Sequence, residues 1–167
     1  DIDSSKCCLN EIIEDVLVII KNSIKHSAEI RLELGQDIPP VECNYQEMAQ
    51  ILINLLTNAR DAVDSKEDDT EQNIITISSG FDGERVYFEV SDNGIGMRDE
   101  DRERIFEPFY STKSDGKGHG LGLYITKNIA DNYNADINIE SEYEKGTKFR
   151  VKFPINKTEE ADDVERN

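Results

Sequence analysis

Two asparagines four residues apart, Asn54 and Asn58, interrupt the apolar helical pattern of QILINLLTNARDAV, residues 50–63. The apolar residues of this segment keep to one face of a helix, and the two amides line up with Asp61 along one edge of that face. Asparagine presents a neutral carbonyl oxygen, the hard ligand that Mg²⁺ accepts when phosphates and water supply the rest of its shell. Taken alone, such a pair is more typical of surface amides on a helix. Two glycine-rich segments that follow in the chain change that balance.

The first glycine segment, VSDNGIGM at residues 90–97, directly follows the strand-like alternation of residues 86–90. A tight glycine turn after a strand brings the backbone close to a ligand, and Asp92 could accept a hydrogen bond there from an exocyclic amine such as adenine N6. The neighbours expected to shape this pocket, with apolar walls for the ring, are Gly94, Ile95, Gly96, Met97 and Ile105. Asp-Asn-Gly is also an ordinary turn sequence, so this segment alone favours a turn over a site.

The second glycine segment, GKGHGLGLY at residues 116–124, leads into an amphipathic helical pattern. Glycine lets backbone N–H groups approach a phosphate, and a helix that begins near Gly120 adds the positive end of its dipole. The segment lacks the preceding strand of a dinucleotide fold and the Gly-x-x-x-x-Gly-Lys-Ser/Thr pattern of a P-loop. We therefore interpret it as an anion cradle that follows a mobile polar loop. The residues expected to contact phosphate are Lys113, Lys117, Gly118, His119, Gly120, Leu121 and Gly122.

Five motifs in order resemble those of the catalytic and ATP-binding domain of bacterial sensor histidine kinases, over residues 9–154. They are the N box (50–63), the G1 box (91–97), the F box (104–113), the G2 box (116–123) and a final glycine motif (142–149). The resemblance implies the Bergerat fold, which gyrase, mismatch-repair ATPases and the large heat-shock chaperones share. In that fold a mixed sheet carries helices on one face, and ATP binds between helices under a flexible lid, here near residues 110–119.

The same resemblance implies catalytic and binding roles for individual residues. Asn58 would bind Mg²⁺ and Asn54 would support the phosphates or the metal shell, while Phe109 and Thr147 would complete the nucleotide contacts. The ATPases of the superfamily carry a glutamate at the position of Asn54, where it positions or deprotonates water. A neutral amide cannot serve as that base, so the cleft is expected to hold ATP for another nucleophile. One departure is Asp61, where many histidine kinases carry lysine or arginine.

The chain holds two histidines, His26 and His119, and neither has the sequence context of a phosphoacceptor. In the family that histidine normally lies on a separate dimerising helical hairpin, in a His-Glu or His-Asp motif followed by proline. The resemblance therefore implies transfer of the ATP γ-phosphoryl group to a histidine on a domain absent from this chain, with a response regulator as the indirect partner. A nucleotide-sensing or scaffolding module without phosphoryl transfer is the alternative. A chaperone-like or topoisomerase-like ATPase is disfavoured by Asn54 and by the missing transducer domain.

The pattern of elements predicts one α+β domain at residues 1–157, followed by an acidic tail at 158–167. The domain should be a two-layer sandwich, with a mixed sheet of about five strands and three main helices on one face. Helices are expected at 9–25, 45–65, 100–105 and 123–133, and strands at 29–34, 41–43, 74–79, 84–91, 135–141 and 147–153. The last two strands should form a hairpin that turns at Glu144-Lys145-Gly146.

Composition limits the functions that this chain can have. The formal net charge of −17 opposes binding to nucleic acid or anionic membranes, which requires clustered Lys and Arg. It also opposes ATP, so Mg²⁺, the glycine amides and nearby lysines must overcome it locally. Three cysteines, two of them adjacent, disfavour a disulfide framework or a zinc site. No apolar stretch reaches the roughly 20 residues that cross a bilayer, so the chain is expected to be cytoplasmic, whether or not its parent protein is anchored to a membrane.

Overall fold

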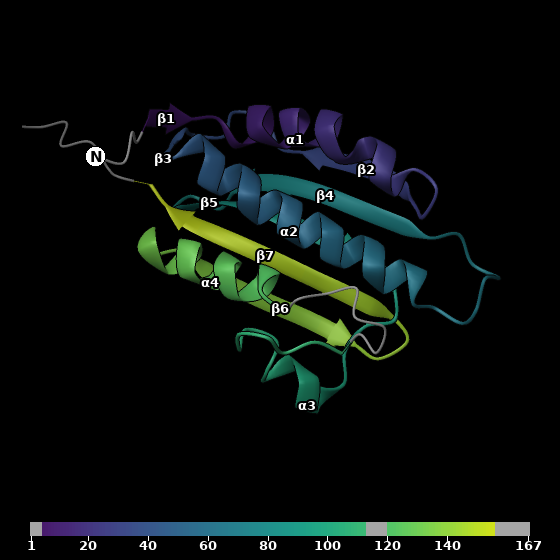
Figure 1. The fold of residues 1–167 in the computed structure, drawn as a ribbon. Coiled ribbons are helices and arrows are strands. Elements are labelled where there is room, and N and C mark those ends of the chain that lie inside the picture. Colours follow the sequence, from purple (N-terminus) through teal and green to yellow (C-terminus); the bar gives the residue numbers. More distant parts are fainter. Residues whose placement is uncertain (1–4, 113–119, 156–167) are drawn as a thin grey trace, which may run out of the picture.

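Helices cover one face of a five-stranded mixed sheet in the computed structural model, which describes residues 5–112 and 120–155 (Figure 1). The strands of this sheet, in spatial order, are β2 (Glu29–Leu34), β4 (Ile74–Phe81), β5 (Arg85–Asp92), β7 (Gly146–Pro154) and β6 (Asp136–Glu142). The helices are α1 (Leu9–Ile24), α2 (Tyr45–Asp64), α4 (Gly122–Asn132) and the short α3 (Asp99–Arg102), which lies beside β6. The predicted α+β two-layer fold is therefore confirmed.

Among the described strands of the main sheet, one neighbouring pair is parallel. β2 runs parallel to β4, with Glu29 opposite Ile74, whereas the β4–β5, β5–β7 and β6–β7 pairs are antiparallel. A parallel pair needs a long crossover connection, which α2 supplies between β2 and β4. The predicted hairpin of β6 and β7 is present, and Lys145 N–H donates to the Glu142 carbonyl oxygen at 3.0 Å in its turn.

A second, two-stranded sheet joins the segment just before α1 to the segment just before α2. In it β3 (Val41–Cys43) pairs antiparallel with β1 (Ser5–Cys7), so β3 is a strand as predicted but does not belong to the main sheet. β1 escapes prediction because its three residues are too few to show an alternating pattern. The other predicted boundaries agree with the structure to within two residues, except that α3 ends at Arg102 and not at residue 105.

The cysteines of this small sheet are free thiols. Cys7 and Cys43 are buried, and the Cys7 thiol donates to the Cys43 carbonyl oxygen at 3.6 Å. Cys8, which immediately precedes α1, is also a free thiol. No helix within the described ranges has the length and apolarity that a membrane span requires.

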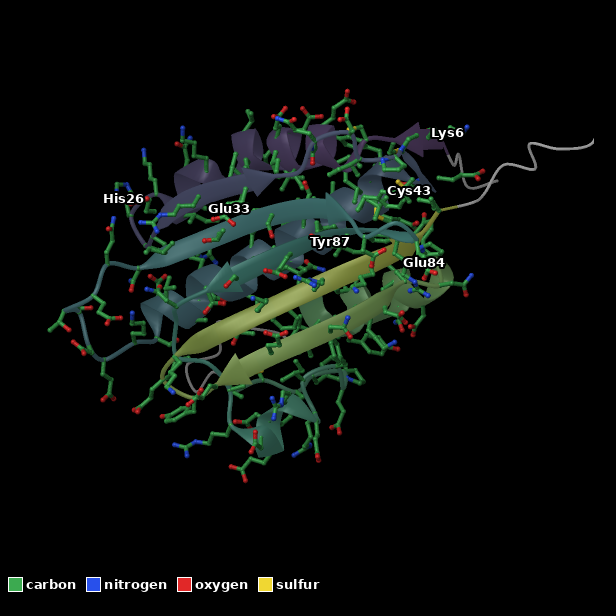
Figure 2. The ribbon with its side chains drawn as sticks, turned by 180° about the vertical axis from the view of Figure 1, so that it is seen from behind. Lys6, His26, Glu33, Cys43, Glu84 and Tyr87 are labelled. Atoms are coloured by element: carbon green, nitrogen blue, oxygen red, sulfur yellow. The ribbon has the colours of Figure 1, made fainter. Side chains whose placement is uncertain are left out.

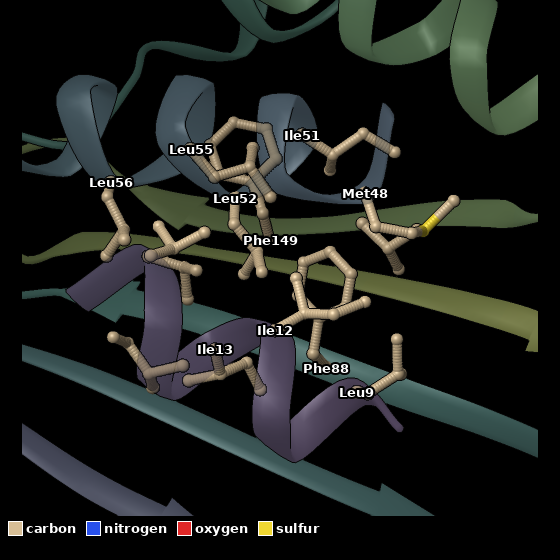
Figure 3. Packing of buried hydrophobic residues seen from close by; sticks show 14 of the residues in the cluster. Leu9, Ile12, Ile13, Met48, Ile51, Leu52, Leu55, Leu56, Phe88 and Phe149 are labelled. Atoms are coloured by element: carbon tan, nitrogen blue, oxygen red, sulfur yellow. The ribbon is translucent and has the colours of Figure 1, made fainter. Parts of the chain in front are cut away.

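The hydrophobic core fills the space between the helices and the inner face of the sheet (Figure 3). α1 and α2 each turn an apolar stripe toward the sheet, because their apolar residues recur at helical spacing. Phe88 of β5 and Phe153 of β7 stack in this core, with their ring centroids 5.9 Å apart. The fully buried side chains around them include Leu9, Ile12, Ile13, Met48, Ile51, Leu52, Leu55 and Leu56. Burial of each such side chain contributes about 1.5–3 kcal/mol relative to exposure, which holds α1 and α2 on the sheet.

The opposite face of the sheet carries charged and polar side chains, among them Glu33 and Tyr87 (Figure 2). Strand β7 alternates between buried residues on the helical side and basic residues, including Lys148 and Arg150, on the other side. Glu89 of β5 is only 8% exposed there, because Arg150 contacts its carboxylate at 2.7 Å and Lys148 lies 3.7 Å from it. Since only one face of the sheet needs apolar side chains, 37% hydrophobic residues suffice for a closed core.

Both ends of α2 are fixed by neighbouring segments. At its start, the Asn44 side chain caps the helix by accepting a hydrogen bond from the Glu47 N–H at 3.1 Å. The Tyr133 hydroxyl, which follows α4, accepts from the Asn44 N–H at 3.1 Å. Near its other end, the Ala62 carbonyl oxygen accepts from the Ile95 N–H in the loop after β5, at 2.9 Å. α2 is therefore positioned by α4 at one end and by β5 at the other.

The turn between β6 and β7 should be intolerant of a side chain at Gly146. This residue has a φ of +129°, and a Cβ on it would lie 2.1 Å from the carbonyl oxygen of Asp92. We expect Gly146→Ala to lower the free energy of unfolding by about 3 kcal/mol, because the backbone of β5 must move and a left-handed φ must be kept. Urea denaturation followed by circular dichroism measures this change.

Gly83→Ala is the matched control for that variant. Gly83 has a φ of +98°, but a Cβ there would meet nothing within 4 Å. This substitution should cost only the strain of the left-handed conformation, about 1–2 kcal/mol. Equal losses for the two variants would show that the close approach to Asp92 does not matter.

Candidate nucleotide-binding site

The loop that follows β5 is fixed against the backbone of α2. In addition to the hydrogen bond from Ile95 to Ala62, a Cβ at Gly94 would lie 2.4 Å from the backbone carbonyl carbon of Ala62. A residue with a side chain therefore does not fit between the loop and the helix. Gly94 is required by this close approach, which brings the end of β5 to the last turns of α2.

Asp92 ends β5 beside this loop and is buried, with 8% of its surface exposed. Burial raises the pKa of its carboxyl group to about 7, while hydrogen bonds from the Gly94 and Thr147 backbone N–H groups and the charge of Lys66 act in the opposite direction. The Gly94 N–H donates to Oδ1 at 2.9 Å. A carboxylate has lone pairs for further donors, so Asp92 is able to accept a hydrogen bond from an amine in the pocket.

The hairpin of β6 and β7 forms the other side of this loop. Gly96 has a φ of +68°, and a Cβ on it would lie 2.0 Å from the Glu142 carbonyl oxygen. The Ser141 hydroxyl accepts from the Met97 N–H at 2.9 Å and lies 2.9 Å from the Thr147 hydroxyl oxygen. The structure thus brings the first glycine segment and the final glycine motif together at one end of the sheet.

The walls beside Asp92 differ in part from those expected. Ile95 and Met97 are half-buried, whereas Ile105 is 6% exposed and belongs to the hydrophobic core. A cavity of about 450 Å³ opens beside Asp92 and is lined otherwise by residues of β5, β6, β7, their turn and α3. None of its lining residues comes from α2 or α4, so this cavity does not extend to the two asparagines.

Asn54 connects α2 to the start of α4. Its amide nitrogen donates to the Gly122 carbonyl oxygen at 3.1 Å and to the Thr126 hydroxyl at 3.3 Å. Its carbonyl oxygen accepts from the Gln50 side chain at 2.8 Å. The bond to the fully buried Thr126 is partly shielded from water, whereas the bond to Gly122 is exposed. The amide of Asn54 is therefore engaged within the protein and holds the second glycine segment against α2.

Asn58 lies one turn further along α2 and has a different environment. It is half-buried, and its amide makes no hydrogen bond within residues 5–112 and 120–155. Its carbonyl oxygen is thus available to a ligand and suits a hard cation such as Mg²⁺. Among the described residues, no group of three or more His, Cys, Asp or Glu is placed to hold a metal ion. A cation at Asn58 would therefore depend on oxygens that a bound nucleotide supplies.

Asp61 follows on the same side of α2. Its carboxylate accepts from the Arg60 guanidinium at 3.2 Å, and 18% of its side chain is exposed. The position where many histidine kinases carry a basic residue is thus occupied here by an acidic side chain that is paired with its own neighbour.

Residues 120–122 join the F box to α4. Gly120 has a φ of +65°, and its carbonyl oxygen accepts from the Phe109 N–H at 2.9 Å. A Cβ on Gly120 would lie 2.4 Å from the Phe109 carbonyl carbon. Leu121 precedes α4, whose first residue is Gly122, and no side chain of the described residues caps the helix there. The N–H groups of this first turn are suited to an anion.

The remaining predicted residues are exposed or lie beyond the described structure. Phe109 has a φ of +66° and is 76% exposed, so its side chain lies on the surface and does not line an enclosed pocket. Lys113, Lys117, Gly118 and His119, with most of the predicted lid, lie outside the described residues.

Two residues at this site carry no signal in the sequence. Ser141 joins the loop after β5 to the hairpin, but a serine within an alternating strand is unremarkable until the loop is placed against it. Lys66 follows α2, and its charge acts on Asp92 across a distance that only the fold determines.

Comparisons with known proteins agree with this geometry. Residues 43–157 match the family described as histidine kinase-, DNA gyrase B-, and HSP90-like ATPase. Sporulation kinase E of Bacillus subtilis (strain 168) is 31% identical over 153 residues, which are 91% of this chain and 20% of that protein. Sensor kinase CckA of Brucella abortus (strain 2308) is 32% identical over 87% of this chain and 16% of that protein. The chain therefore spans a fifth or less of the length of these relatives.

Solved structures show the same arrangement. The nucleotide-free catalytic domain of histidine kinase ThkA superposes with a TM-score of 0.75 at 28% identity, over 91% of this chain and 95% of that domain. Full-length ShkA in complex with AMPPNP shares the fold, with a TM-score of 0.77 at 24% identity over 92% of this chain and 31% of that protein. The family expected from the five motifs is thus confirmed. This chain belongs to the family of histidine kinase-, DNA gyrase B- and HSP90-like ATPases and has the fold of a histidine kinase catalytic domain.

Proposed function

We propose that this chain is the ATP-binding catalytic domain of a two-component sensor histidine kinase and acts in the cytoplasm. It passes the γ-phosphoryl group of ATP to a histidine on a separate dimerisation and phosphoacceptor domain, and a response regulator receives the group next. The contrast between the two asparagines carries the proposal. The Asn58 amide makes no hydrogen bond to the described residues and suits a metal-bound nucleotide, whereas Asn54, at the position of the hydrolytic glutamate, is neutral and engaged with α4. The cleft can thus hold ATP without activating water.

The two ends of the site would bind the two ends of the nucleotide. Asp92 accepts from the exocyclic amine of adenine, and the absence of side chains at Gly94 and Gly96 lets the base approach the backbone. The phosphates lie toward the uncapped N–H groups at the start of α4, near Gly122. Asn58 would hold Mg²⁺ together with the nucleotide, and the metal would supply neutralisation of charge on the phosphate oxygens. This local arrangement offsets the overall charge of −17.

Phosphoryl transfer depends on positioning and electrostatic stabilisation more than on covalent chemistry from the protein. Asn54 contributes by holding the first turn of α4, so the N–H groups that face the phosphates keep a fixed place relative to Asn58. The attacking nucleophile comes from the partner domain, because the sequence around His26 is not that of a phosphoacceptor and Asn54 carries a neutral amide.

A phosphotransfer assay tests the proposal directly. The 167-residue chain is mixed with γ-labelled ATP, Mg²⁺ and its own phosphoacceptor domain. We expect acid-labile, base-stable label on a histidine of that domain and very slow release of free phosphate when the domain is left out. Tight ATP binding without any transfer would instead support a nucleotide-sensing module, and turnover near 1 s⁻¹ or more without the partner would support an ATPase.

Asp92→Asn should raise the free energy of unfolding and lower the affinity for ATP. Between the ordinary pKa of Asp and about 7, the folded protein keeps a proton that the unfolded chain releases, so the free energy of unfolding falls as pH rises. Asparagine does not titrate, and the stability advantage of the variant should grow by about 2–3 kcal/mol from pH 5 to pH 8. Urea denaturation at the two pH values measures this difference.

The same variant should bind ATP about ten- to a hundredfold more weakly, because an amide nitrogen would then face the amine of adenine. Asp69→Asn is the matched control, because this substitution makes the same change in charge at an exposed position. Calorimetry at pH 8 gives both affinities. An unchanged affinity in Asp92→Asn would remove Asp92 from the base site, and a stability difference independent of pH would contradict its burial.

The two asparagines should respond in opposite ways to truncation. Asn58→Ala should leave the free energy of unfolding unchanged but weaken Mg²⁺-dependent ATP binding and phosphoryl transfer, while metal-free ATP binding is unaffected. Asn54→Ala loses its three hydrogen bonds to Gln50, Gly122 and Thr126 and should destabilise the protein by about 1–3 kcal/mol. Denaturation and calorimetry with and without Mg²⁺ separate the two. Equal losses of affinity with and without metal in Asn58→Ala would refute the metal role.

A further inference from the structure

The side-chain nitrogen of Lys66 is buried and has no hydrogen-bond partner among the described residues. The residue follows α2, and its ammonium nitrogen is the single such side-chain atom in the described part of the chain. A buried ammonium that lacks a hydrogen-bonded partner costs several kcal/mol in general. A buried polar group left in this state in a native protein calls for an explanation, such as a ligand that completes its hydrogen bonds.

Lys66 follows the end of α2 that the loop after Asp92 contacts. The Lys66 N–H donates to the Val63 carbonyl oxygen at 3.3 Å, so the residue sits just beyond the last turn of α2. The loop after β5 rests on that same turn, since a Cβ at Gly94 would lie 2.7 Å from the Val63 nitrogen. The segment that carries Asp92 and the segment that carries Lys66 are therefore in direct backbone contact.

The charges around Lys66 support this placement. Lys66 interacts electrostatically with Asp92 and with Asp68. Lys66 lowers the pKa of Asp92 against the larger opposing effect of burial. The pKa of the exposed Asp68 is lowered chiefly by hydrogen bonds from Thr70, with a small contribution from Lys66. Neither carboxylate accepts a hydrogen bond from the ammonium, so its donors stay free for another group.

We propose that Lys66 is a second base-reading residue of the nucleotide site, whose ammonium donates to a ring nitrogen of adenine next to the exocyclic amine, N1 or N7, while Asp92 accepts from that amine. The inference rests on the proposed ATP site. Adenine presents its amine, a donor, between two ring nitrogens that accept. An acceptor and a donor held side by side in the protein complement this edge. Guanine has a carbonyl oxygen where adenine has the amine, and that oxygen would face the carboxylate of Asp92.

Removal of the Lys66 ammonium should not lower the stability of the nucleotide-free protein but should weaken ATP binding. Lys66→Met keeps most of the length and apolar surface of the side chain but removes the unpaired charge. The nucleotide-free variant should therefore be at least as stable as the parent in thermal unfolding. Its affinity for ATP should nevertheless fall about tenfold, because the hydrogen bond to the ring nitrogen is lost.

Base analogues identify the contact. The parent chain and Lys66→Met are titrated calorimetrically with ATP, 1-deaza-ATP and 7-deaza-ATP in the presence of Mg²⁺. We expect the parent to bind one of the two analogues about tenfold more weakly than ATP, and Lys66→Met to bind ATP and that analogue equally. Lys21→Met, at an exposed position in the last turn of α1, should keep every affinity of the parent.

Each outcome of these titrations supports or overturns the proposed contact between Lys66 and the adenine ring. If Lys66→Met discriminates between ATP and both analogues as the parent does, Lys66 does not touch the ring and the inference is overturned. A variant that is less stable than the parent and loses affinity equally for all three nucleotides would make Lys66 a structural residue, which also overturns it. Binding and discrimination as expected, without phosphotransfer to a histidine, would overturn the proposed kinase function and leave this inference standing.

Discussion

The close approach of three backbone segments at the end of β5 is the constraint on which the site depends. The loop after β5 lies against α2 on one side and against the β6–β7 hairpin on the other, and Gly94, Gly96 and Gly146 leave no room for a Cβ at either contact. Backbone groups brought this close must find hydrogen-bond partners. Ile95 supplies both, since its N–H donates to α2 and its carbonyl oxygen accepts from Glu144 at 2.5 Å. The helix, the strand and the hairpin are thereby fixed to one another without reliance on long side chains.

This constraint explains why polar groups are buried where they reduce stability. Asp92 is held in a place where its ionised form is disfavoured, and the ammonium of Lys66 has no hydrogen bond to any described residue. Neither arrangement stabilises the empty protein. The apolar contact of α1 and α2 with the sheet offsets the cost, since its side chains are almost completely buried. The packing of apolar side chains on one face of the sheet thus compensates for destabilising polar side chains at the end of the sheet.

Sequence periodicity was sufficient for the elements that are long or regular. The apolar stripes of α1 and α2 and the alternation of β4, β5 and β7 follow from local geometry, so their positions could be predicted. β1 could not, because it is a strand only through its pairing with β3. Among site residues, the types of Asn54, Asn58 and Asp92 were informative, but the engagement of Asn54 by α4 depends on contacts across many residues of chain.

The roles of Ser141 and Lys66 could not be predicted, and the physical reason is the same for both. Ser141 and Lys66 matter only because the loop after β5 is brought to them, and no local pattern marks a residue whose role is set by a distant neighbour. Phe109, which is expected at the nucleotide from its motif, is exposed in the structure, and its contact with a nucleotide stays a prediction. Residue type shows what a side chain is able to do, whereas its environment is set by the packing of the whole domain.

The antiparallel pairing of β5 with β7 has a consequence for the folding of the chain. Asp92 and its neighbour across the strands, Thr147, are separated in sequence by α3, the F box, α4 and β6, so the pocket exists only when this long-range pairing has formed. Pairings of this kind are slow to form because a large loop must close first. A partly folded chain that lacks β7 has no base site. If Asp92 holds the base as proposed, nucleotide binding is linked to unfolding of the entire sheet, and a higher ATP concentration makes opening to proteases rarer.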